Sequence, residues 1–64
     1  DLGVKQKDGK IIIKPYTKER NFAKGTVVMP HGKVYVEWEK NNGKINLNYT
    51  VPPGTEVLVE SDNY

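Results

Sequence analysis

Apolar and polar side chains alternate with a period of two along most of this 64-residue chain. The clearest case is residues 33–40, where Val34, Val36 and Trp38 alternate with lysine, tyrosine and glutamate. Such alternation places one set of side chains on each face of a β-strand. No window of about a dozen residues shows apolar side chains at helical spacing, so we expect little or no helix.

Turn signals divide the chain into short segments. Asn42-Gly43 is a strong hairpin signal because both residues tolerate a positive φ. Pro52-Pro53-Gly54 indicates a rigid turn. Gly25 indicates a bulge or the close approach of another element. The strands expected from these patterns cover residues 2–5, 10–14, 22–29, 33–40, 44–51 and 55–60.

Roughly five or six short strands, with turns about every eight to twelve residues, favour an all-β fold. We expect a small antiparallel β-sandwich of Greek-key or jelly-roll type, with a partly open barrel as the alternative. Strands joined by hairpins are antiparallel, and the chain offers no crossover helix for a parallel sheet. We expect a single domain over residues 1–64, with a lead-in at 1–9, the sandwich at 10–60 and a frayed tail at 61–64.

Length and composition restrict how such a fold is stabilised. A domain of this size buries only about 60% of its unfolded surface, and a chain without cysteine has no disulfide. Because the chain begins at Asp1, we expect it to be a piece of a larger protein. The net charge is +2 and the lysines are scattered, which argues against a nucleic-acid surface. No apolar run is long enough to span a membrane.

Few residues suggest chemistry. Glu37 and Glu39 share one strand face, and glycoside hydrolysis uses two carboxylates. Catalytic pairs converge from different elements, however, so we expect solvated carboxylates that face residues such as Lys44 across the hairpin. His31 stands alone in a Pro-His-Gly turn, without a nucleophile or companion metal ligands. We therefore expect no catalytic residue, no metal and no cofactor.

Aromatic side chains are the remaining candidates. Trp38 and Tyr49 share the faces of apolar neighbours, so we expect both rings to be mostly buried. Tyr35 lies on the polar face of its strand and Tyr16 lies in a loop. We identify Tyr35, Tyr16 and Trp38 as possible contacts for a sugar or for a neighbouring domain, and favour packing against a domain.

The run HGKVYVEWEKNNGKINLNYTVPPGTEVLVE at residues 31–60 resembles the C-terminal β-sandwich domain of bacterial α-L-rhamnosidases. Two upstream segments also fit, IIIKP at residues 11–15 and FAKGTV at 22–27. Phe22 stands where that family commonly has tryptophan, and His31 where it commonly has tyrosine. The matching features within the run are His31-Gly32, Trp38, Asn42-Gly43-Lys44, residues 51–55 and the valine strand at 57–59.

The resemblance implies a domain that follows a large α/α-barrel catalytic domain, where the acid and base carboxylates lie. No catalytic residue carries over onto this chain, so it implies a non-catalytic accessory domain that packs on the barrel of a glycoside hydrolase. An exposed apolar or aromatic surface should then mark the contact. One alternative is an independent carbohydrate-binding module. A second is a small nucleic-acid-binding barrel, in which Lys24, Lys33 and Lys44 converge.

Overall fold

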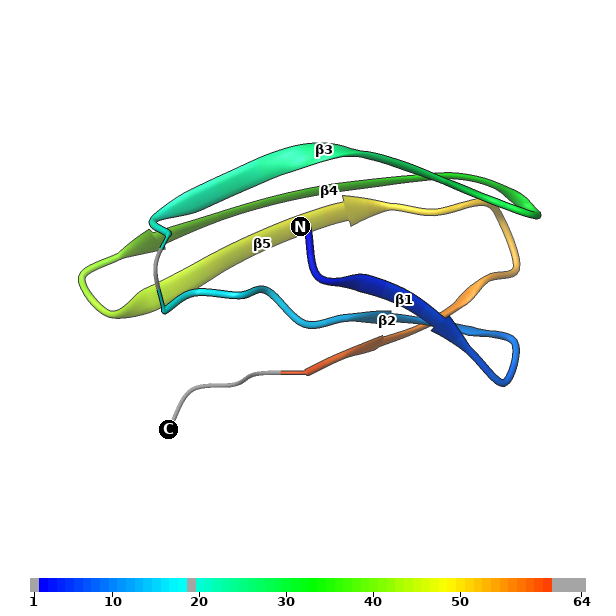
Figure 1. Cartoon of the computed structure of the whole chain (residues 1–64), viewed down its shortest axis with the longest axis horizontal. Coiled ribbons are helices and arrows are strands. Elements are labelled where there is room, and N and C mark those ends of the chain that lie inside the picture. The colour runs from blue at the N-terminus through cyan, green and yellow to red at the C-terminus, as the bar shows by residue number, and fades with distance from the viewer. Residues whose placement is uncertain (1, 19, 61–64) are drawn as a thin grey trace.

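Two three-stranded β-sheets make up the part of the chain that the structure describes (Figure 1). The computed structural model describes residues 2–18 and 20–60, which contain no helix. The all-β sandwich expected from the alternation is therefore confirmed. The short sheet has the order β1-β2-β6, from Val4–Lys7, Lys10–Ile13 and Glu56–Val59. The long sheet has the order β3-β4-β5, from Phe22–Met29, Gly32–Asn41 and Lys44–Thr50.

The long sheet is an antiparallel meander built by two tight turns. Asn41 pairs with Lys44 across the β4–β5 turn, where Asn42 and Gly43 have φ values of 54° and 80°. These are the positive values that the Asn-Gly signal predicts. The resulting register places Ala23, Trp38 and Leu47 side by side on the inner face, which meets the short sheet.

Strand pairing in the short sheet corrects one expectation. Strand β1 begins two residues later than expected and pairs antiparallel with β2, but β6 runs parallel to β2. The chain makes this parallel pair without a crossover helix because the whole long sheet forms the connection between β2 and β6. The absence of a helix therefore did not exclude parallel pairing in a sandwich.

The core lies between the inner faces of the two sheets. Trp38 is only 1% exposed, which confirms its expected burial. At Gly25 another segment approaches the strand closely, as the sequence suggested, because a Cβ there would lie 3.0 Å from Leu2 Cδ1. Leu2 lies two residues before the first residue of β1, so the contact places the start of β1 beneath β3. The buried hydrophobic residues are Ile11, Ile13, Ala23, Val34, Val36 and Trp38.

The short sheet covers only part of the long sheet. Its strands have four residues each, whereas those of the long sheet have seven to ten. The loop after β2 covers part of the remainder, where Lys40 Nζ donates a hydrogen bond to the Thr17 carbonyl at 3.0 Å. Tyr49 on edge strand β5 nevertheless stays 42% exposed, so its expected burial is wrong.

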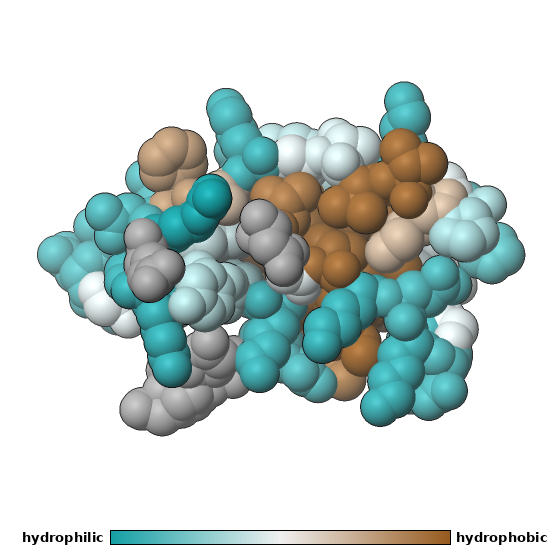
Figure 2. Space-filling model, viewed as in Figure 1, coloured by the Kyte–Doolittle hydropathy of each residue, from teal (hydrophilic) through white to brown (hydrophobic). Residues whose placement is uncertain are grey.

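The two long sides of the sandwich can be told apart. Because β1 lies beneath β3, strands β5 and β6 form the edges on the opposite side, which we call the β5–β6 side. Figure 2 shows the β1–β3 side, with hydrophobic groups near the β3–β4 turn and hydrophilic groups near the β4–β5 turn. Ile45 and Tyr49 of β5 and Val59 of β6 are exposed.

Candidate binding face on the long sheet

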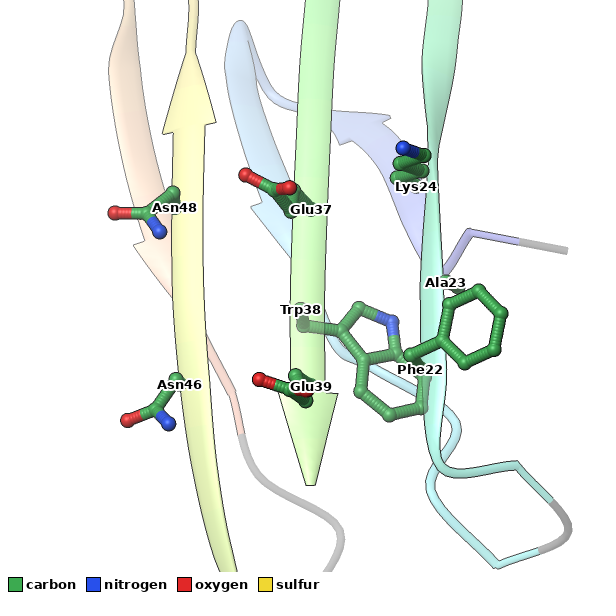
Figure 3. Close-up of a pocket in the computed structure, with 8 residues that line it drawn as sticks. All are labelled: Phe22, Ala23, Lys24, Glu37, Trp38, Glu39, Asn46 and Asn48. Carbon is green, nitrogen blue, oxygen red and sulfur yellow. The ribbon is translucent and has the colours of Figure 1, made fainter. Parts of the chain in front are cut away.

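A shallow depression of about 330 Å³ lies on the outer face of the long sheet, which faces away from the short sheet (Figure 3). Its floor includes Ala23 and Trp38, whose side chains belong to the core. Six exposed side chains on the three strands surround this floor. We call them the polar face: Phe22, Lys24, Glu37, Glu39, Asn46 and Asn48.

Strand register arranges the polar face in two rows. The first row is Phe22, Glu39 and Asn46 across β3, β4 and β5. The second is Lys24, Glu37 and Asn48. Side chains within a row are about 5 Å apart at Cβ, and the rows are about 7 Å apart. Every carboxylate therefore has a carboxamide beside it on the next strand.

The polar groups of this face have no ion-pair or hydrogen-bond partner within residues 2–18 and 20–60. Lys24 lies directly opposite Glu37, yet no ion pair joins them. Figure 3 shows the Glu37 and Glu39 carboxylates turned toward β5, away from Lys24. An ion pair is formed on the short sheet instead, between Lys10 Nζ and Glu56 at 3.8 Å. The acceptors and donors of the polar face remain available to a ligand.

The placement of the two glutamates is partly as expected. Glu37 and Glu39 are exposed on one strand, as predicted. Their cross-strand neighbours on β5 are Asn48 and Asn46, whereas Lys44 pairs with Asn41, so Lys44 is not the expected partner. The lysine opposite Glu37 is Lys24 of β3. Both carboxylates project from the same strand onto an open face. This arrangement suits hydrogen bonding to a bound group better than attack on a bond from two sides.

The three aromatic candidates lie in different environments. Trp38 is in the core, and its Nε1 has no hydrogen-bond partner among the described residues. Tyr35 is half-buried on the outer face, between Thr26 and Thr50. Tyr16 is 45% exposed in the loop after β2. The structure does not bring these rings together, and a surface contact is sterically open only to the two tyrosines.

Sequence reasoning did not assign Phe22, Asn46 and Asn48 to a site. Phe22 is 64% exposed and borders the depression. The two asparagines sit at alternate positions of β5, a strand context in which asparagine is disfavoured. That unfavourable composition is the signal in the sequence that could have indicated a binding face.

A second cleft, of about 380 Å³, lies at the end of the sandwich where three turns meet. His31 lines it from the β3–β4 turn, and Pro52 and Pro53 line it from the β5–β6 connection. Gly32 has a φ of 138°, and a Cβ there would lie 2.9 Å from Pro52 Cγ. The His-Gly and Pro-Pro-Gly segments therefore form one packed unit.

Other site types find little support in the described part of the chain. Within it, no group of three histidine, cysteine or acidic residues is placed to hold a metal ion. It also contains no helix of a kind that could cross a bilayer. Lys24, Lys33 and Lys44 share the outer face by strand alternation, but Glu37 and Glu39 lie between them. Nucleic-acid binding, against which the scattered lysines argue, stays an untested alternative.

Fold and site together define a small two-sheet β-sandwich domain with an exposed polar sheet face. Residues 8–61 match the family model described as the bacterial alpha-L-rhamnosidase C-terminal domain. The chain therefore belongs to this family and is an accessory domain of an enzyme of that type. No curated protein and no solved structure gives a significant match.

Proposed function

We propose that this chain is a non-catalytic C-terminal domain that packs on the catalytic domain of a parent α-L-rhamnosidase through its β5–β6 side. The family match supports the location of the domain within a larger enzyme. The observation that carries the proposed contact is the incomplete covering of the long sheet. Apolar side chains that point inward from β5 and β6 are left exposed.

The exposed residues belong to the inner face by their register. Tyr49 pairs with the fully buried Val36, and Val59 pairs with the fully buried Ile13. Ile45 is 38% exposed near the β4–β5 turn, beyond the region that the short sheet covers. Burying apolar surface contributes about 25 cal/mol per Å², so a neighbouring domain on this side would gain stability from it.

Strand β6 offers a second feature for a domain contact. Among the described strands it is an edge strand that pairs with β2 alone, and its outward-facing Leu58 is 47% exposed. Unprotected apolar edge strands tend to pair or aggregate unless another element covers them. By contrast, edge strand β1 carries Lys5 and Lys7, which protect an open edge. The side with the apolar edge strand is the side proposed for the contact.

Substitution of Tyr49 in the parent enzyme tests this proposal. We expect Tyr49→Ser to lower the melting temperature of the parent by several degrees, because the contact with the catalytic domain loses an aromatic ring. In the isolated 64-residue chain the same substitution should lower the free energy of unfolding by only about 1 kcal/mol, since Tyr49 is already 42% exposed to water. Thermal and urea unfolding followed by circular dichroism measure both.

Val28→Ser is the matched control, because Val28 is 76% exposed on the outer face of the long sheet. It should leave the melting temperature of the parent and the free energy of unfolding of the isolated chain unchanged. The proposal is wrong if Tyr49→Ser affects the parent no more than Val28→Ser does. Hydrolysis of an aryl α-L-rhamnoside by the isolated chain would contradict its non-catalytic role.

A further inference from the structure

Apart from Phe22, the polar face is occupied by residues that strand formation disfavours. Asparagine is depleted in strands, and glutamate is depleted to a lesser degree. Here two of each occupy adjacent strands, although threonine would keep the surface soluble and fit a strand better. The next row of the same face has that composition, with Thr26, Tyr35 and Thr50. A departure from local preference in one patch indicates a functional role.

The groups of the polar face match the hydrogen-bonding pattern of sugar hydroxyls. A hydroxyl both donates and accepts, so neighbouring hydroxyls are well matched by a carboxylate that accepts and a carboxamide that does both. The Glu37–Asn48 and Glu39–Asn46 pairs each provide this combination on neighbouring strands. None of the four side chains is engaged by another described residue, so binding need not break an internal contact.

Phe22 adds an apolar surface at one end of the first row. Its ring is 64% exposed and, in Figure 3, lies beside β3 at the border of the depression. An exposed aromatic ring can cover the C–H side of a sugar while polar groups bind its hydroxyls. The depression of about 330 Å³ is at the lower end of the size range of small-molecule sites, enough for one or two sugar residues.

The charge of the polar face restricts the class of ligand that this face can bind. The face carries Glu37 and Glu39 against Lys24, which gives a net charge of −1 at neutral pH. Phosphates, uronic acids and nucleic acids would meet two carboxylates, and carboxylates repel them. We propose that the polar face is a binding subsite for a neutral saccharide. The choice of L-rhamnose as the probe rests on the proposed function.

An NMR titration of the 64-residue chain with methyl α-L-rhamnopyranoside tests the inference. The dispersion of the amide spectrum first shows that the chain is folded. We expect saturable shifts confined to residues near 22–24, 37–39 and 46–48, with a Kd of roughly 1–10 mM. Sodium D-glucuronate, an anionic sugar, should bind at least about fivefold more weakly because the two carboxylates repel it.

Surface variants assign the shifts to the polar face. Asn48→Ala and Phe22→Ala should each weaken binding about fivefold or more. Val28→Ala, on the same outer face but outside the depression, should leave the Kd unchanged. All three positions are exposed, so the folded amide spectrum should persist in each variant.

Three results would overturn the inference. These are the absence of shifts at about 50 mM sugar, shifts spread over the whole surface, and equal binding by the Phe22→Ala and Val28→Ala variants. If Phe22→Ala destabilises the parent enzyme as Tyr49→Ser is expected to do, the polar face is instead a domain contact. The saccharide site and the β5–β6 contact lie on different surfaces and use different measurements, so each can fail without the other.

Discussion

Single residues show why two separated motifs occur together in this chain. Gly32 ends the β3–β4 turn and Pro52 follows β5, yet they touch in the folded molecule. The φ of 138° at Gly32 lies in the region that side chains with a Cβ avoid. A side chain there would also be too close to the proline ring. Gly32 is thus needed for its backbone conformation and for the close approach.

Two glycine substitutions separate the requirement for a positive φ from the requirement for a close approach. Gly32→Ala should lower the free energy of unfolding by about 2–3 kcal/mol, because backbone strain adds to a steric clash. Gly43→Ala should cost less, about 1 kcal/mol, since φ is 80° but nothing lies within 4 Å of the added Cβ. Urea unfolding measures both variants.

The double variant Gly32→Ala/Pro52→Ala completes the test, because it removes Pro52 Cγ. The double variant should lose less free energy of unfolding than the sum of the losses in Gly32→Ala and Pro52→Ala. Additive effects within about 0.3 kcal/mol would show that the two turns are not coupled in this way.

At the scale of elements, the strands differ in how well they are held. Central strand β4 has neighbours on both edges and carries the buried Val34, Val36 and Trp38. Edge strand β6 has four residues, one neighbour and two exposed apolar side chains, Leu58 and Val59. Local opening should therefore release β6 well before β4.

Native-state hydrogen exchange measures this difference in the unmodified chain. Amides of β4 should exchange through global unfolding, so their rates should rise steeply with low concentrations of denaturant. Amides of β6 should exchange faster, and their exchange rates should depend little on denaturant, because local opening exposes little surface. The amides of β3 that bond to β4 serve as an internal reference and should follow β4. Equal protection of β4 and β6 would contradict the prediction.

The whole molecule depends on a small core. A chain of 64 residues has a free energy of unfolding of roughly 3–10 kcal/mol, and only six hydrophobic side chains are buried among the described residues. Trp38 is the largest of them. Its Nε1 is buried without a partner in the described part of the chain, which offsets some of the stability that its burial contributes.

Trp38→Ala should consequently remove most of the stability of the isolated chain, because truncating a buried tryptophan costs about 3–5 kcal/mol. Trp38→Phe should cost less, since it keeps a ring in the core and removes the unpaired donor. Phe22→Ala is the exposed control and should change the free energy of unfolding by less than about 1 kcal/mol. Urea unfolding followed by far-ultraviolet circular dichroism compares all three. A Trp38→Ala variant as stable as Phe22→Ala would contradict this view of the core.

Much of the element structure could be predicted because it depends on neighbours in sequence. The alternation from Val34 to Trp38 and the Asn42-Gly43 turn specify strands and a hairpin locally. Five of the six strands lie within one residue of the expected ranges at both ends, and the first is shifted by two residues. Burial of Trp38 followed from the same alternation.

The candidate site was predicted only in part. The sequence placed Glu37 and Glu39 on one exposed face but assigned them the wrong neighbours. That assignment depends on the register across the Asn42-Gly43 turn, which brings Asn46 and Asn48 beside them. The exposed ring of Phe22 joins them only because β3 pairs with the other edge of β4.

The sequence by itself determined strands, turns and the two faces of each strand, because side-chain alternation and turn conformation act over a few residues. Only the tertiary structure decided which strands meet and which faces are covered. It paired β6 parallel to β2 and left Tyr49 exposed, because four-residue strands cannot cover a longer sheet. Such outcomes depend on contacts between segments far apart in the chain, and no local pattern encodes them.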